Sequence, residues 1–192
     1  MQVVRKANGM LAFIARGIEY KRREVLLRLY RALTRPQLVY CVQSWAPYLR
    51  KDILALEGVQ RRFTRMMPLL RGLSYEERLN ELGLYSLEFR RMRGDLIETY
   101  KMMNGMDRIE VERLFPLKKD SRTRGHSLKI KGGRFRTELR RNFFTQRVVN
   151  LWNSLPVEVV EAASLNIFKK RVDGFLIREG IKGYGERAGR WS

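Results

Sequence analysis

Apolar residues recur at intervals of three or four over most of the chain, which is the spacing of one face of an amphipathic helix. This pattern predicts helices over residues 2–16, 22–34 and 52–67. Arg35-Pro36 should break or kink the second helix, because proline lacks a backbone N–H and crowds the preceding turn. The apolar run from Leu38 to Trp45 fits a buried helix or a strand, and we favour a helix.

The next helices carry their own start and stop signals. Ser74 followed by Glu77 forms a capping box, and Gly83 suits the left-handed residue that ends a helix. Asn104-Gly105 marks the end of a longer helix, and Ser164 caps a last one. We therefore predict helices over residues 74–82, 86–103, 109–115 and 142–153, and from 164 onward.

Residues 128–136 interrupt the helical pattern. Leu128 to Lys131 alternates apolar and basic residues, Gly132-Gly133 follows, and Arg134 to Arg136 alternates again. Two short alternating arms around a Gly-Gly pair are typical of a β-hairpin. The predicted fold class is therefore mainly α, a helical bundle with a short basic β-hairpin near 128–136 and two further C-terminal helices.

These patterns divide the chain into three structured segments and a tail. The first is a helical segment over 1–70, the second continues the helices over 71–117, and the third holds the hairpin and C-terminal helices over 118–179. Residues 180–192 contain four glycines and no apolar period, which predicts a disordered tail.

The composition indicates a folded and strongly basic protein. Hydrophobic residues make up 44% of the 192 residues, and 40 Lys and Arg stand against 20 Asp and Glu, a net charge of +20. A single cysteine excludes an internal disulfide, and one Cys with one His excludes an ordinary Cys/His zinc site. Because the sequence has no run of 18 apolar residues and no secretory pattern at its start, we expect an intracellular protein, nuclear or cytoplasmic, with a polyanion as partner.

The positive charge is concentrated in two blocks. Residues 1–40 and 121–160 each carry 9 basic and 2 acidic residues, whereas residues 81–120 carry 8 of each. Lys and Arg neutralise nucleic-acid phosphates, and aromatic side chains stack on unpaired bases. The residues that we predict to bind nucleic acid are Lys21, Arg22, Arg23, Arg61, Arg62, Arg65, Arg122, Arg124, Lys129, Lys131, Arg134, Arg136, Arg140, Arg141 and Arg147, with Phe135 as a base-stacking residue.

Catalytic and metal chemistry have little support in the sequence. The five aspartates are scattered, and no P-loop, GxGxxG or HExxH motif is present. We expect His126 to be an exposed loop residue and Cys41 to be a buried, inert thiol. Arg90, Arg91 and Arg93 are expected on the exposed side of the long helix. No catalytic residue, metal site or cofactor is therefore assigned to this chain.

Several ordered blocks of the sequence resemble one protein family. They are LYRALTRPQLVYCVQSWAPYLRKDILALEGVQRRFTRM (residues 29–66), LSYEERLNELGLYSLEFRRMRGDLIETYKMMNG (73–105), SRTRGHSLKI, RRNFFTQRVVNLWNSLP (140–156) and ASLNIFKKRVD (163–173). In this order they resemble the region that follows the polymerase palm in non-LTR, LINE-type retrotransposon reverse transcriptases of the jockey and chicken-repeat-like clades. The resemblance runs from about Lys6 to Leu176, and Val39 departs from it where relatives often have Glu.

The resemblance implies a helical thumb and post-thumb region that comes without its palm. The family's paired-aspartate turn, an aromatic-Ala-Asp-Asp motif, has no match here, so the Mg²⁺ ions of the parent RNA-directed DNA polymerase have no assigned ligands in this chain. The implied role is to grip template RNA and the primer–template duplex through phosphate contacts, without sequence choice. The implied partners are RNA, DNA and the missing palm domain.

Two alternatives stay open at this point. In the first alternative to the binding role, the chain is a fragment of a complete RNA-directed DNA polymerase whose catalytic part is missing. In the second, it is a decayed or co-opted remnant that acts as a protein-interaction module. A membrane-surface role ranks last, because the polar faces of the predicted helices mix acidic with basic residues.

Overall fold

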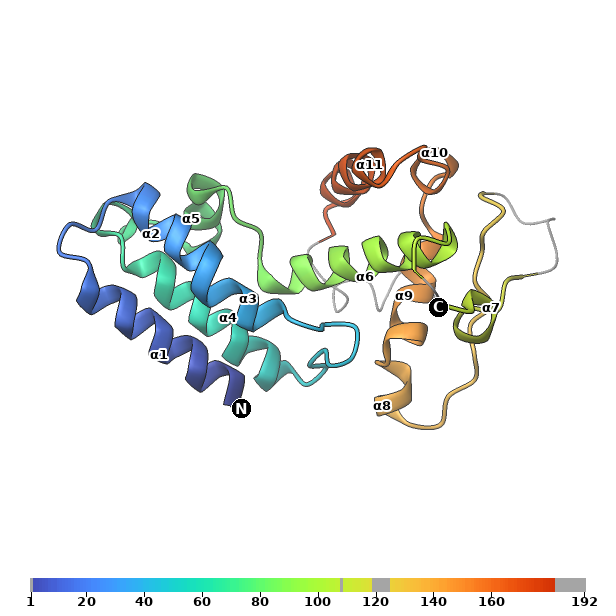
Figure 1. The fold of residues 1–192 in the computed structure, drawn as a ribbon, viewed down its shortest axis with the longest axis horizontal. Helices are drawn as coiled ribbons and strands as arrows, with labels where there is room; N and C mark the ends of the chain where they lie inside the picture. The colour runs from blue at the N-terminus through green and yellow to red at the C-terminus, as the bar shows by residue number, and fades with distance from the viewer. Residues whose placement is uncertain (1, 108, 119–124, 182–192) are drawn as a thin grey trace. The chain divides into compact units, whose positions relative to one another are not determined.

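The computed structural model describes residues 2–107, 109–118 and 125–181, and this part of the chain is mainly α-helical (Figure 1). Among those residues, the only β-structure is one isolated antiparallel bridge between Leu117 and Ile130. No described helix is long and apolar enough to cross a membrane. The predicted mainly α class is therefore confirmed, and the predicted tail lies almost wholly outside the described residues.

The chain packs into two compact units. Unit 1 comprises residues 1–41 and 47–90, and unit 2 comprises residues 42–46 and 91–192. The division falls within helix α6 (Leu87–Met103), whose first turn belongs to unit 1. This grouping by contacts does not test the predicted segmentation at residues 70, 117 and 179, which stays a prediction.

Unit 1 begins with α1 (Gln2–Gly17), α2 (Arg23–Leu29), α3 (Arg35–Val39) and α4 (Arg50–Arg65). Their apolar faces meet in a core in which Leu11, Leu26 and Phe63 are fully or almost fully buried. Tyr30 stacks on Phe63 with ring centroids 4.0 Å apart, and its hydroxyl donates a hydrogen bond to Gln60 at 2.6 Å. Most of the predicted apolar faces thus pack in the core, but Val25 and Leu33 of the second predicted helix are exposed.

Pro36 widens the helical path without interrupting it. Residues Tyr30–Thr34 form a π-helical turn, η1, that joins α2 directly to α3. The N–H of Arg35 donates to the carbonyl of Tyr30, five residues earlier. Because Pro36 lacks an N–H and its ring crowds the preceding turn, a wider turn accommodates both defects. The helix then ends at Val39, so the run to Trp45 is helical only in its first residues.

Unit 1 continues through a 3₁₀ turn, η2 (Pro68–Leu70), and α5 (Tyr75–Leu82). Ser74 Oγ accepts from the N–H of Glu77 at 3.3 Å, and the Glu77 carboxylate accepts from the N–H of Ser74 at 2.7 Å. Gly83 ends the helix with a φ of +57°. The capping box and the glycine stop are therefore confirmed.

A buried polar network fixes the start of α6 within unit 1. The carboxylate of Glu57 accepts hydrogen bonds from the hydroxyl of Tyr75 and from the N–H of Leu87, the first residue of α6. A negative charge at this position is favourable for the helix N-terminus. Burial and the neighbouring Glu57 carboxylate raise the pKa of Tyr75, so this phenol stays protonated and keeps donating.

Unit 2 contains the rest of α6, followed by α7 (Val111–Leu114), α8 (Glu138–Arg141), α9 (Phe144–Asn153), α10 (Val157–Val160) and α11 (Leu165–Arg178) (Figure 1). Tyr100 of α6 stacks on Phe168 of α11 with ring centroids 4.1 Å apart, and Trp152 of α9 lies 6.2 Å from Phe168. Ser164 caps α11 as predicted, because its Oγ accepts from the N–H of Ile167.

The arginines of α6 are more enclosed than predicted. Arg91 is buried and Arg90 is half-buried. Arg93 pairs with Asp173 of α11, with 2.8 Å between Nη2 and Oδ2. The prediction that Arg90, Arg91 and Arg93 lie on an exposed side is therefore wrong, since α11 lies against part of that side.

The predicted β-hairpin over residues 128–136 does not form. Ile130 is buried and bridges to Leu117, outside the predicted hairpin, while residues 131–136 are exposed and unpaired as strands. A two-residue turn at the glycines would set Lys131 opposite Arg134 and Lys129 opposite Arg136. Like charges directly opposite each other destabilise a strand pair, which explains why this segment finds other backbone partners.

Candidate nucleic-acid interface

Residues 128–133 follow an extended path that side chains of α9 hold in place. Asn153 pairs with both backbone groups of Ile130, since its Oδ1 accepts from the N–H and its Nδ2 donates to the carbonyl, each at 2.8 Å. Two turns earlier on α9, Gln146 Oε1 accepts from the N–H of Gly133 at 3.1 Å. These contacts fix the backbone at the start of a long exposed run.

That run, residues 131–141, is exposed along its whole length, and we call it the basic strip. Its single acidic residue, Glu138, pairs with Arg141 at 3.4 Å. Within the described part of the chain, no carboxylate lies within 4.0 Å of the charged groups of Arg134 and Arg136. The strip therefore presents a local excess of positive charge to solvent. Its cationic residues are Lys131, Arg134, Arg136, Arg140 and Arg141.

Two exposed phenylalanines accompany the strip. Phe135, in its middle, is 47% exposed, and Phe143, just beyond its end, is 44% exposed. The guanidinium of Arg140 lies over the ring of Phe143, 5.4 Å from its centroid. Phe144 points inward instead and packs edge-on against Phe115. The sequence interpretation favoured Phe135 as the stacking residue and gave Phe143 and Phe144 less weight. Adjacent residues at a helix start point in different directions, which is why Phe143 is exposed while Phe144 is buried.

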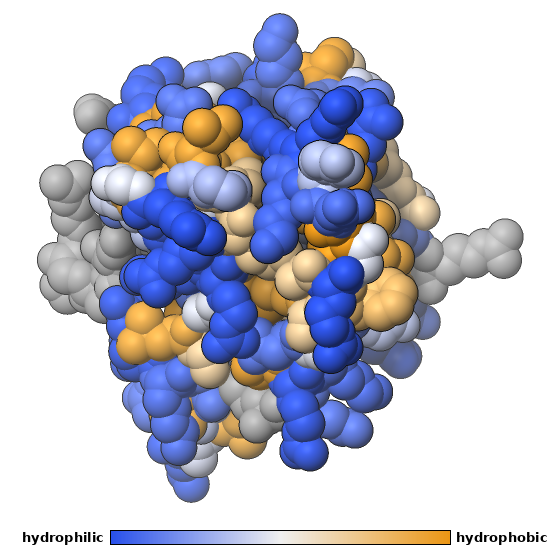
Figure 2. All heavy atoms as spheres, turned by 90° about the vertical axis from the view of Figure 1, so that its left-hand side faces the viewer, coloured by the Kyte–Doolittle hydropathy of each residue, from blue (hydrophilic) through white to orange (hydrophobic). Residues whose placement is uncertain are grey.

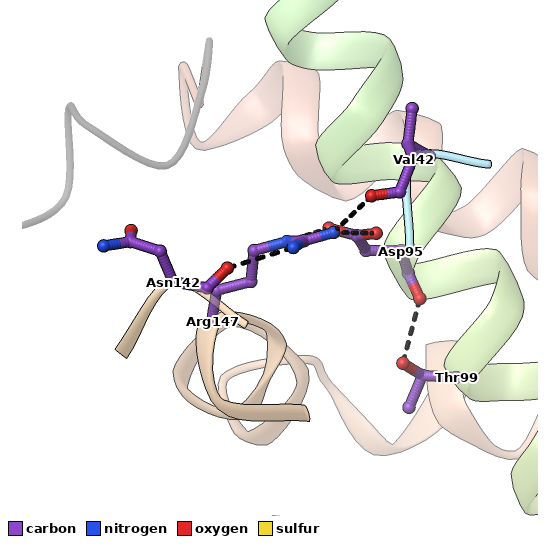
Figure 3. Close-up of polar contacts among 5 residues, drawn as sticks. All are labelled: Val42, Asp95, Thr99, Asn142 and Arg147. Carbon is purple, nitrogen blue, oxygen red and sulfur yellow. Dashed lines mark hydrogen bonds and ion pairs between the residues drawn. The ribbon is translucent and has the colours of Figure 1, made fainter. Parts of the chain in front are cut away.

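Arg147 differs from the predicted binding residues of the basic strip because its side chain is only 8% exposed. Figure 3 shows its guanidinium directed at the carboxylate of Asp95, at 2.8 and 2.9 Å. Further donors reach the carbonyls of Asn142 and Val42 at 3.0 and 2.9 Å. Since its donors are engaged inside unit 2, we leave Arg147 out of the proposed nucleic-acid surface.

Three other predicted residues lie next to the strip in sequence. Arg122 and Arg124 lie outside the described residues. Lys129 is half-buried, and its carbonyl accepts from the N–H of Lys118 at 2.8 Å. Among the described residues of the basic block 121–160, the exposed cations therefore begin at Lys131.

In unit 1, Lys21, Arg22 and Arg23 are exposed where α2 begins. Arg23 donates to the carbonyl of Glu81 on α5 and lies 4.0 Å from its carboxylate. Figure 2 looks at the side of the molecule where α1, α2 and α5 are drawn, and hydrophilic side chains cover much of it with hydrophobic ones between them. Lys21 and Arg22 are thus available to a polyanion, whereas Arg23 also has a structural contact.

The second cluster in unit 1 lies on the last turns of α4. Arg61, Arg62 and Arg65 are all exposed. The guanidinium of Arg61 lies 4.5 Å from the ring centroid of Tyr75, and Arg62 donates to Asn8 on α1. Arg62 and Arg65 also stand in the last turn, where cations favour the helix C-terminus. These arginines combine accessibility with local structural contacts.

Two predictions about reactive side chains are wrong. His126 is buried rather than exposed, with its Nε2 3.1 Å from the carbonyl of Trp152 and its ring edge-on to the Trp152 indole. Burial lowers the pKa of His126. Cys41 is exposed rather than buried, because α3 ends at Val39 and the chain turns at Cys41 with a φ of +48°.

Among the residues that the structure describes, no group of three or more His, Cys, Asp or Glu side chains is placed to hold a metal ion. Comparison with known proteins finds no matching family model, no matching curated protein and no matching solved structure. A functional proposal therefore rests on two observations. One is the geometry of the basic strip, and the other is the similarity of several sequence blocks to a known protein family.

Proposed function

We propose that this chain is a nucleic-acid-binding helical module, equivalent to the thumb and post-thumb region of a LINE-type retrotransposon reverse transcriptase. The observation that carries the binding role is the basic strip, an exposed run with five cations and one carboxylate. The ordered sequence blocks over residues 29–173 support the family. In this proposal the residues of this chain bind nucleic acid, and the catalytic carboxylates with their Mg²⁺ belong to the palm of the parent polymerase.

The strip suits phosphate contact in its chemistry. Arginine presents planar N–H donors that match phosphate oxygens, and lysine adds a point charge. Such contacts position a nucleic acid without reading its bases. The proposed ligands are therefore template RNA and the primer–template duplex, bound with little sequence preference.

The backbone of the basic strip is held by hydrogen bonds, which favours nucleic-acid binding in addition to the effect of charge. Asn153 and Gln146 already hold the chain on the N-terminal side of Arg134, and Thr137 caps α8 by accepting from the N–H of Arg140 at 3.3 Å. A segment that is ordered before binding loses less conformational entropy on binding. The exposed cations of unit 1, led by Lys21 and Arg22, would add further phosphate contacts.

Charge reversal with a matched control tests this proposal. The first variant changes Arg134, Arg136 and Arg140 to Glu, and the control changes Arg113, Lys170 and Arg178 to Glu. Both sets are exposed residues of unit 2, and both change the net charge equally. Affinity for a labelled RNA–DNA hybrid duplex is measured by fluorescence anisotropy.

The proposal predicts that the strip variant binds at least about tenfold more weakly than the wild type, because several phosphate contacts are lost together. The control should lose much less, since only the general field of the protein changes. Equal losses in both variants, or no binding by the wild-type chain, would contradict the proposal.

A further inference from the structure

The basic strip carries aromatic side chains as well as charge. Phe135 and Phe143 each leave close to half of their surface in solvent, whereas the neighbouring Phe144 is buried against Phe115. Single exposed apolar residues are ordinary on protein surfaces. These two rings lie among cations, since Arg134 and Arg136 flank Phe135 in the sequence and the guanidinium of Arg140 lies over Phe143.

The ring of Phe143 has a defined place. It is the residue before α9, and its carbonyl accepts from the N–H groups of Gln146 and Arg147 in the first turn, at 2.9 and 3.0 Å. The guanidinium of Arg140 lies 5.4 Å from the ring centroid. A cation is therefore held beside an accessible aromatic surface.

Phe135 stands two residues beyond a fixed point of the backbone. The N–H of Gly133 is bound by Gln146, and a Cβ added at Gly133 would come within 3.0 Å of the Gln146 amide nitrogen. The absence of a Cβ at Gly133 thus allows the strip to lie close to Gln146 of α9 at this residue. Phe135 follows on the exposed side of that approach.

We propose that Phe135 and Phe143 stack on unpaired bases while Lys131, Arg134 and Arg136 contact the phosphates between them, so that residues 131–143 form a binding site for single-stranded nucleic acid. This inference rests on the proposed nucleic-acid-binding function and specifies its ligand at this site. An aromatic ring needs the open face of an unpaired base, and alternating cations and aromatics are the means by which proteins bind single strands. In a duplex the base faces are covered by their neighbours, so only the cations would act.

The test uses the full chain and three labelled probes: a single-stranded RNA, a blunt-ended RNA duplex without a loop, and an abasic strand that keeps the sugar-phosphate backbone. The variants are Phe135→Leu alone and Phe135→Leu with Phe143→Leu. Phe13→Leu, at an exposed phenylalanine of α1, is the matched control. Leucine keeps an apolar side chain and removes the aromatic face, and circular dichroism checks that each variant is folded.

The inference predicts that the double variant loses about fivefold or more in affinity for single-stranded RNA for each stacked base, with the single variant intermediate. The affinity of both variants for the duplex should stay within about twofold of the wild-type value. The wild type should bind the abasic strand about as weakly as the double variant binds single-stranded RNA. Phe13→Leu should match the wild type on all probes.

The failures of the two proposals are distinguishable. A wild-type chain that binds neither RNA probe overturns the proposed function itself. A wild-type chain that binds both, together with phenylalanine variants that lose nothing or lose duplex and single strand alike, overturns the single-strand site only. Full loss in the single Phe135→Leu variant would remove Phe143 from the site.

Discussion

Arg147 and Asp95 form a two-point ion pair that joins α9 to α6 inside unit 2. Arg147 Nε lies 2.8 Å from Asp95 Oδ2, and Nη2 lies 2.9 Å from Oδ1. The Asp95 side chain has no exposed surface. Because α9 also carries Asn153 and Gln146, the helix that holds the basic strip is itself held by a buried charge pair (Figure 3).

Removing one partner of this pair should strongly destabilise unit 2. Asp95→Ala leaves the guanidinium of Arg147 buried without its counter-charge, and breaking a buried pair in this way costs about 3–5 kcal/mol. Urea unfolding followed by tryptophan fluorescence measures the loss. Glu138→Ala, which breaks the exposed pair with Arg141, should change stability little. Equal effects of the two substitutions would contradict the structural role of Arg147.

Asn153→Ala should loosen the extended segment from α9. It removes two hydrogen bonds to Ile130, whose backbone is buried, and a buried group left without its partner costs about 1–3 kcal/mol. Hydrogen exchange at the Ile130 amide should accelerate accordingly. Asn150→Ala, on an exposed position of the same helix, is the control and should leave that exchange rate unchanged.

Stability should fall as the pH drops through the unfolded pKa of histidine toward the lower pKa of folded His126. Burial lowers the pKa of His126 and repulsion by Lys129 adds to this, while the Trp152 carbonyl and Glu161 oppose it. Histidine in the unfolded chain has a pKa of about 6.5, so below that pH the unfolded chain binds more protons than the folded one. The unfolded state is stabilised, and the free energy of unfolding falls. Melting temperatures compared at about pH 7.5 and about pH 5.5 measure this loss of stability. His126→Gln should show a smaller decrease, and an identical decrease would refute the assignment.

Two glycines should respond to alanine with opposite signs. Gly83 ends α5 with φ at +57°, where a Cβ is strained, so Gly83→Ala should destabilise by about 1 kcal/mol. Gly58 lies inside α4 with open space around its added Cβ, so Gly58→Ala should stabilise by up to about 1 kcal/mol. Thermal unfolding of both variants checks the pair. Stabilisation by Gly83→Ala would be the contrary result.

Features that depend on residues close in sequence could be predicted. The reciprocal bonds of Ser74 and Glu77 span three residues, and the left-handed turn at Gly83 needs only a residue without a Cβ. The apolar spacing likewise located the long helices, because a helical face repeats within one or two turns.

Features that depend on distant partners could not be predicted. Ile130 bonds to Asn153 and bridges to Leu117, and neither partner lies within the Gly-Gly pattern that indicated a hairpin. The same holds for Arg147, whose place in a basic block suggested phosphate contact while Asp95, 52 residues earlier, holds it inside. Exposure of Lys131 to Arg141 as one strip is likewise a product of this long-range anchoring.

The most direct test of the account is the salt dependence of binding, with log affinity measured against log salt concentration for duplex and single-stranded RNA. If about six phosphates are contacted, the slope should be about −5 on duplex and about −4 on single strand. Changing Arg134, Arg136 and Arg140 to Glu should remove about three phosphate contacts, so both slopes should become shallower in proportion. An affinity that does not change with salt, or slopes that the variant leaves unchanged, would contradict the claim that the basic strip grips nucleic acid through its phosphates.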